Sequence, residues 1–124
     1  MRIDIQGRGF PLTAALLDHT NGRLRLALAR TRDQIKRVVV RLGDSNGPRG
    51  GEDKFCKIRV VLVGAPPVLI EDAGADLYAV IDRAADRAGR NAAKHVARLR
   101  EDARPGRHKR LDVLSGDDID VSKN

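Results

Sequence analysis

Residues 35–63, IKRVVVRLGDSNGPRGGEDKFCKIRVVLV, consist of two apolar runs separated by a polar segment. Residues 35–42 and 55–63 are rich in β-branched and apolar side chains, whereas residues 43–54 are dense in Gly, Asn, Asp and Pro. This composition predicts two antiparallel strands joined by a long flexible hairpin loop. Because side chains alternate between the two faces of a strand, one face is expected to be apolar and the other basic. The expected core positions are Val38, Val40, Leu42, Cys56, Ile58, Val60 and Leu62, and the opposite face carries Arg37, Val39, Arg41, Lys57, Arg59, Val61 and Val63.

The sequence before this hairpin predicts a strand followed by a helix. Ile3 and Ile5 alternate with polar residues until glycines break the pattern, which is typical of a half-buried strand that ends in a loop. Leucines at helical spacing then predict a helix from about Thr13 to about Arg30, with the threonine as its N-cap. Gly22 inside that helix costs about 1 kcal/mol relative to alanine, so the helix is expected to depend on tertiary packing.

The sequence after the hairpin predicts a short strand and a long helix. Pro66 and Pro67 force a turn, after which residues 68–71 supply a fourth strand. Residues 75–100 then carry an apolar stripe at helical spacing that is largely alanine, so this helix can pack closely. The order β-α-β-β-β-α predicts an α/β two-layer sandwich, with a four-stranded mixed sheet and both helices on one face.

The length of 124 residues suits one domain with a tail. We expect residues 1–101 to form that domain. Residues 102–124 combine Pro, Gly, a basic cluster and a low-hydrophobicity acidic end, so we expect them to be a disordered tail.

Composition favours a polyanionic partner. There are 24 Lys and Arg against 17 Asp and Glu, which gives a formal net charge of +7 and an isoelectric point near 10.3. Nucleic acid is the leading partner, ahead of an anionic membrane surface. The N-terminus lacks the apolar core of a signal peptide and no segment is long enough to span a membrane, so a cytoplasmic location is expected. Cys56 is the single cysteine, and neither a disulfide, a metal nor another cofactor is expected.

The most informative pattern lies on the second helix. Five basic residues recur there at spacings of three and four and should stack along one side as a ridge roughly 22 Å long. Such a ridge can follow several phosphates of a nucleic acid. A charged face that serves only solubility is the alternative, and Asp82 and Asp86 could pair with the ridge and support it. The residues of the ridge are Arg83, Arg87, Arg90, Lys94 and Arg98.

Two further basic surfaces are expected. The first helix and its exit contribute basic residues that could line a positive groove with the second helix. The open face of the sheet is the other surface, but Phe55 is its only candidate for stacking a base, so recognition through RNA backbone and shape is favoured. The groove candidates are Arg23, Arg25, Arg30, Arg32, Lys36 and Arg37, and those of the sheet face are Arg37, Arg41, Lys57 and Arg59.

No pattern of residues predicts an enzyme. Asp18 and His19 could form an acid and base pair, but no nucleophile signature or metal triad accompanies them. The glycines around Arg8 lack the remainder of a nucleotide-binding fingerprint. Cys56 falls on the core side of its strand, where an unreactive buried thiol is expected.

The second helix resembles a known family. Residues 76–82, DLYAVID, followed by the basic ridge, look like the D-x-Y-x-x-I-D/N segment and basic helix of the ribosome hibernation promoting factor and ribosome-associated inhibitor family, also called sigma factor modulation proteins. Residues 13–16 and 23–24 resemble that family's first helix, and Arg8 falls where a basic loop residue is common. The resemblance covers about residues 1–100 and is of the short type, without the additional C-terminal domain of long members.

The resemblance implies a monomeric, non-catalytic protein that binds the small ribosomal subunit and occupies the tRNA and mRNA path in idle cells under stress. It implies no small-molecule substrate and no membrane. The glycine-rich loop, Pro66-Pro67 and Gly89 depart from the family pattern. A generic double-stranded RNA-binding protein and a protein-interaction module that regulates transcription or translation are the alternatives. Carried over with the ridge, the expected rRNA-binding residues are Arg8, Arg23, Arg83, Arg87, Arg90, Lys94 and Arg98.

Overall fold

The computed structural model describes residues 1–9, 11–44 and 54–102. The order of elements in these residues is the predicted β-α-β-β-β-α, with one added 3₁₀ helix, η1, before the second strand. Most of the predicted hairpin loop and all but the first residue of the predicted tail lie outside the described residues. The elements are β1 (Arg2–Arg8), α1 (Ala14–Ala27), η1 (Ala29–Gln34), β2 (Ile35–Asp44), β3 (Lys54–Leu62), β4 (Val68–Gly74) and α2 (Leu77–Asp102).

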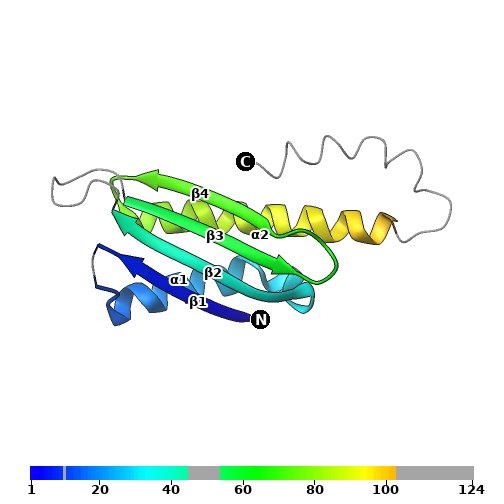
Figure 1. Ribbon diagram of the computed structural model, residues 1–124, viewed down its shortest axis with the longest axis horizontal. Coiled ribbons are helices and arrows are strands. Elements are labelled where there is room, and N and C mark those ends of the chain that lie inside the picture. The colour runs from blue at the N-terminus through cyan, green and yellow to red at the C-terminus, as the bar shows by residue number, and fades with distance from the viewer. Residues whose placement is uncertain (10, 45–53, 103–124) are drawn as a thin grey trace.

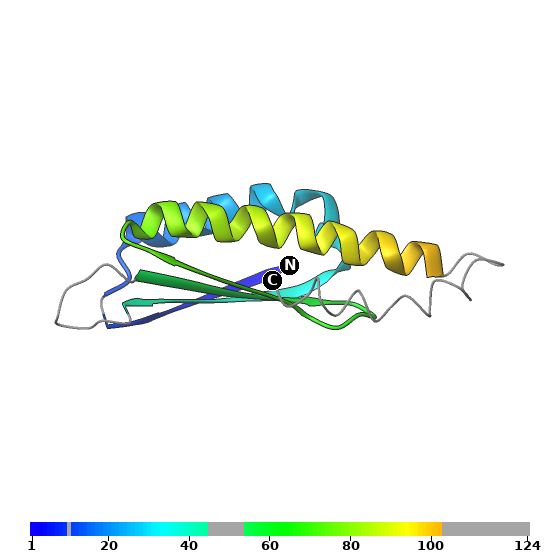
Figure 2. The same ribbon diagram turned by 90° about the horizontal axis from the view of Figure 1, so that it is seen from above.

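The described strands form a four-stranded mixed sheet in the order β1-β2-β3-β4. β1 runs parallel to β2, and the other neighbouring pairs are antiparallel. Both helices cover the same face of the sheet, α1 behind β1 and β2 and α2 behind β3 and β4, which leaves the other face open (Figures 1 and 2). The predicted two-layer α/β sandwich is therefore confirmed.

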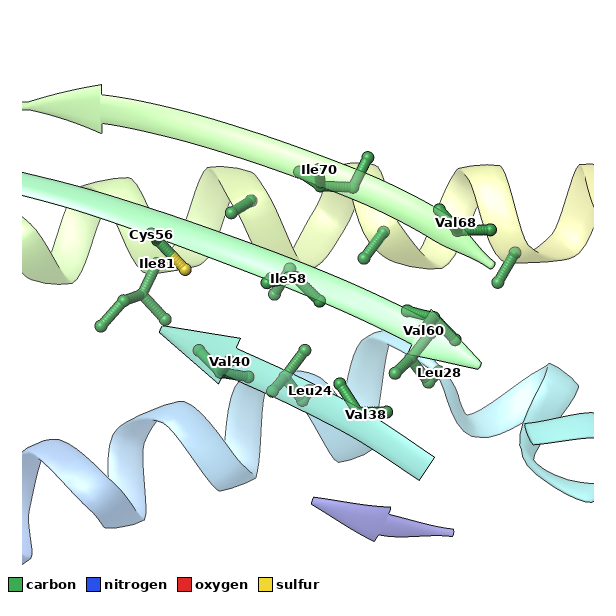
Figure 3. Packing of buried hydrophobic residues seen from close by; sticks show 14 of the residues in the cluster. Leu24, Leu28, Val38, Val40, Cys56, Ile58, Val60, Val68, Ile70 and Ile81 are labelled. Carbon is green, nitrogen blue, oxygen red and sulfur yellow. The ribbon is translucent and has the colours of Figure 1, made fainter. Parts of the chain in front are cut away.

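The core lies between the sheet and the helices, as the strand alternation predicted. The seven expected core positions of β2 and β3 are all buried, and the apolar side chains of β4 and both helices complete the cluster (Figure 3). On α2 the buried positions include Ala84, Ala88 and Ala92, whose small side chains bring the helix close to its neighbours.

α1 begins as predicted but ends earlier. The Thr13 hydroxyl accepts a hydrogen bond from the backbone N–H of Leu16 at 3.1 Å, which is the expected N-cap. The prediction that the helix continues to Arg30 is wrong, because the α-helix ends at Ala27 and the chain tightens into η1. The backbone N–H of Thr31 donates to the Leu28 carbonyl three residues earlier, which is the 3₁₀ pattern.

Gly89 of α2 packs against the end of α1 too closely for a side chain to fit. A Cβ atom at this position would come within 2.5 Å of the Ala27 carbonyl oxygen at the end of α1. Helix packing therefore explains the glycine, although a glycine inside a helix lowers helix propensity. Gly22 of α1 differs, because a Cβ atom there would meet nothing within 4 Å.

The described part of the chain contains neither a candidate membrane span nor a candidate metal cluster. None of its helices has the length and apolar character that crossing a bilayer requires. Residues 1–9, 11–44 and 54–102 also contain no group of three or more His, Cys, Asp or Glu side chains arranged to hold a metal ion.

Candidate RNA-binding surface

The predicted basic ridge lies on α2, on the side of the helix that reaches over β4. We call Arg83, Arg87, Arg90, Lys94 and Arg98 the α2 ridge. Its first residue touches β4 directly: Arg83 Nε donates to Asp72 Oδ2 at 3.1 Å and one terminal nitrogen donates to the Ala73 carbonyl at 3.3 Å. Arg87 donates to the Glu71 carbonyl at 3.0 Å and lies 3.9 Å from the Asp72 carboxylate. These two arginines therefore join the helix to the last strand.

The acid that they share is largely buried. The Asp72 side chain is 17% exposed and lies between Arg83 and Arg87, so its charge is offset locally by two guanidinium groups. The charges of Arg83 and Arg87 are consequently partly neutralised by an acid of the same chain. We expect the first two ridge arginines to bind an external anion less strongly than their number alone suggests.

The two residues in the middle of the α2 ridge present their charges to solvent. Arg90 and Lys94 are exposed, and among the described residues neither forms an ion pair or a hydrogen bond through its side chain. Arg98 is half-buried and does have a polar or electrostatic partner. The two exposed residues are four positions apart, so their side chains project from successive turns of one helix face.

The seam between α1 and α2 is not the positive groove that was expected. Arg23 of α1 lies 3.2 Å from both Asp82 and Asp86 of α2, and His19 Nε2 lies 2.7 Å from Asp82 Oδ1. Tyr78 adds an edge-on ring contact to His19 at 4.8 Å between centroids. The acids point to α1 and not to the ridge, so the seam is a charge-balanced helix contact.

Arg8 lies on another surface. It ends β1 and faces the open side of the sheet, where it lines a pocket with Arg41, Phe55 and Lys57. The sequence-predicted rRNA-binding residues are therefore divided: the α2 ridge is one group, Arg23 lies in the helix seam, and Arg8 belongs to the sheet. No spacing within the sequence indicated that Arg8 and Arg41 would line one pocket, because the parallel pairing of β1 with β2 places them on the same face of the sheet.

The open sheet face is basic, as predicted. Arg37, Arg41, Lys57 and Arg59 are all exposed and line a broad cavity of about 470 Å³ with Leu69 and Glu71. Lys57 lies 3.7 Å from the Glu71 carboxylate, but both side chains are more than half exposed, so this ion pair holds them weakly.

The single cysteine lies in the core, as predicted. Burial, with the nearby Asp72 charge as a smaller cause, raises the pKa of the Cys56 thiol to about 12. A protonated thiol is a poor nucleophile, so this residue lacks the setting of a reactive cysteine.

Comparison with known proteins identifies the family. The model of the family described as "Sigma 54 modulation protein / S30EA ribosomal protein" matches residues 3–100. The N-terminal domain of Protein Y from Thermus thermophilus is 33% identical with a TM-score of 0.65, and the alignment covers 76% of this chain and 98% of that domain. A ribosomal subunit interface protein from Coxiella burnetii has the same fold, with a TM-score of 0.68, 21% identity and coverage of 78% and 99% of the two chains.

No curated protein matches the chain. The family model nevertheless spans most of the sequence, and it includes the whole α2 ridge and every element except the first residue of β1 and the last two residues of α2. The chain belongs to the Sigma 54 modulation protein / S30EA ribosomal protein family, the hibernation factor family that its second helix resembles.

Proposed function

We propose that this protein binds the small ribosomal subunit with the α2 ridge against rRNA and blocks the tRNA and mRNA path of idle ribosomes. The observation that carries the proposal is the exposed pair Arg90 and Lys94, which have no acidic partner among the described residues. Membership of a ribosomal protein family supports rRNA as the RNA that is bound. Neutralising phosphates with such side chains releases counterions, which favours binding and makes it depend on salt.

The mechanism that we propose is steric and requires no catalysis. A rigid two-layer domain holds the ridge on one helix of 26 residues, so the protein can occupy a groove in RNA without first ordering its own backbone. The bound domain then excludes tRNA, mRNA and initiation factors and keeps the ribosome inactive. We propose that residues 1–101 are the binding unit and that it acts as a monomer in the cytoplasm.

A matched pair of charge reversals tests the ridge. Arg90→Glu/Lys94→Glu changes the net charge by the same amount as Arg25→Glu/Arg32→Glu, whose arginines are exposed on α1 and η1 without an ion pair among the described residues. Co-sedimentation of the full chain with purified small subunits is the measurement. We expect the ridge variant to lose binding and the control variant to retain most of it. Equal losses would mean that binding follows net charge and not the ridge.

The occlusion step needs a separate test. Small subunits carrying mRNA are titrated with the wild-type protein, and the tRNA that remains bound is measured by filter binding. We expect tRNA to be displaced in proportion to protein bound. Simultaneous binding of protein and tRNA would refute occlusion while leaving rRNA binding intact. Equal affinity for free duplex RNA and for subunits would instead favour the generic double-stranded RNA-binding function.

A further inference from the structure

The open sheet face carries a small pocket at the end where β1 stops. Strand pairing aligns Arg8, Gly43 and Phe55 across β1, β2 and β3, and the next row on the same face contains Arg41 and Lys57. A pocket of about 230 Å³ opens between these rows. We call it the sheet pocket; Gln6, Gly7, Arg8, Arg41, Leu42, Phe55 and Lys57 line it.

The Phe55 ring in the sheet pocket packs against the backbone of Gly43. A Cβ atom on Gly43 would lie 2.4 Å and 2.5 Å from two carbons of the Phe55 ring and 3.1 Å from the Arg8 carbonyl oxygen. The ring therefore rests directly over the glycine backbone, in space that any other residue would fill. This contact holds the ring on the open face of the sheet, away from the core between sheet and helices.

The residues that line the sheet pocket include three cations and no acid. Arg8 and Arg41 form no ion pair among residues 1–9, 11–44 and 54–102. Lys57 lies with its ammonium 5.4 Å from the ring centroid, a cation–π distance, and its side chain is 53% exposed. Because its aliphatic stem is flexible, the ammonium can leave the ring for a nearby anion. The pocket thus offers an aromatic face and three cations within one sheet corner.

We propose that the sheet pocket binds one unpaired RNA nucleotide, with the base stacked on Phe55 and the flanking phosphates held by Arg8, Arg41 and Lys57. Paired bases in a duplex are already stacked and cannot lie on the ring, so the ligand is single-stranded. The sheet pocket lies on the open face of the sheet, whereas the α2 ridge lies on a helix of the other layer. Figure 2 shows these two layers of the domain. This inference rests on the proposed function, to which it adds a second RNA contact of a different kind.

Nuclear magnetic resonance of the full chain tests the stacking directly. The chain contains two phenylalanines and one tyrosine, so the aromatic proton spectrum is sparse and Phe55→Leu identifies the ring signals. The probe is a single-stranded RNA hexanucleotide of mixed sequence. We expect the Phe55 ring protons to shift upfield on titration, while those of Tyr78, which lies by the helix seam, stay unchanged.

Affinity for the same hexanucleotide supplies the second measurement. Loss of one base stack weakens binding roughly fivefold to 150-fold, so Phe55→Leu is expected to fall in this range. Gly43→Ala leaves every charge in place but displaces the Phe55 ring, because the added Cβ atom clashes with it. We expect a similar loss of affinity. Lys57→Gln alters an exposed side chain that the fold does not need and should weaken binding and reduce its salt dependence. Arg32→Gln removes one exposed charge from η1, which precedes β2, and is the matched control.

The outcomes separate this inference from the proposed function. Binding of the wild type to small subunits, with no ring shift and with unchanged hexanucleotide affinity in Phe55→Leu and Lys57→Gln, would overturn the sheet pocket alone. Equal binding of a polyglutamate peptide or of an RNA duplex of the same length would also overturn it, because the face would then accept any polyanion. Failure of the wild type to bind subunits would instead remove the proposed function.

Discussion

Replacing Gly89 with alanine puts a methyl group where α2 meets the end of α1. The new Cβ atom would lie 2.5 Å from the Ala27 carbonyl oxygen and 3.2 Å from the Ala27 side chain. The first separation is far below van der Waals contact and involves backbone, which no rotamer change can move. The helices must therefore shift apart, and overpacking of this kind costs about 1–3 kcal/mol.

The helix propensity of alanine works against that cost. An interior Gly→Ala change favours a helix by about 0.8–1.0 kcal/mol, so the absolute effect at Gly89 mixes two opposed contributions. Gly22→Ala in α1 has the same gain without a clash, because nothing lies within 4 Å of its added Cβ atom. The difference in unfolding free energy between the two variants therefore isolates the clash, and we expect it to be about 1–3 kcal/mol.

Thermal and urea denaturation followed by circular dichroism measures this difference. For a domain of this size, 1 kcal/mol corresponds to about 4–8 °C in Tm. Gly22→Ala should melt above the wild type, and Gly89→Ala should melt below Gly22→Ala by at least that amount. An equal rise in Tm in both variants would mean that α1 and α2 do not pack closely at Gly89.

Four further predictions remain: one on the cap of α1, two on the cysteine and one on the α2 ridge. Thr13→Ala removes the N-cap of α1 and should lower the unfolding free energy by about 1 kcal/mol in urea titration. Thr13→Ser keeps the hydroxyl and should retain most of the wild-type unfolding free energy. Iodoacetamide at pH 8 should modify native Cys56 on the order of 1000-fold more slowly than the unfolded chain, because burial raises the pKa of the thiol from 9.0 to about 12; equal rates would contradict its burial. For the same reason the thiol's contribution to folding should be fully present below pH 9 and be lost as the pH rises toward 12. Arg90→Gln/Lys94→Gln should reduce the slope of log affinity against log salt by about 2 in subunit binding, and an unchanged slope would mean that neither side chain meets a phosphate.

The sheet and its core could be predicted because their pattern is local. In β2 and β3 an apolar residue occupies every second position, and burial follows that alternation at Val38, Val40, Ile58 and Val60. Cys56 was assigned to the core by the same alternation, and it is buried there. Such a pattern needs no knowledge of distant contacts, so the fold class followed from the sequence.

Contacts between distant segments could not be predicted. The spacing of the ridge residues is correct for one helix face, but the sequence does not show that Asp72 of β4 would pair with Arg83 and Arg87. The direction in which Asp82 and Asp86 point also depends on where α1 packs. The prediction of a positive groove was wrong because these two acids pair with Arg23 of α1. The end of α1 was missed because η1 continues the helical spacing with a tighter turn.

These contacts change which basic residues matter for binding. Arg23, Arg83 and Arg87 have partners within the fold, so their removal should affect stability as well as RNA affinity. Arg90 and Lys94 have none among the described residues and give the cleaner test of an RNA contact.

Directed cleavage of rRNA from α2 measures whether the α2 ridge lies against rRNA of the tRNA and mRNA path. Ala97 is exposed on α2 between Lys94 and the end of the helix, so Cys56→Ala/Ala97→Cys offers one accessible thiol for an iron chelate that generates hydroxyl radicals. On small subunits, we expect cleavage confined to rRNA that lines the tRNA and mRNA path, and loss of that cleavage when tRNA and mRNA are added in excess. Cleavage elsewhere on the subunit, or cleavage that persists unchanged with tRNA and mRNA bound, would mean that α2 does not bind in this path.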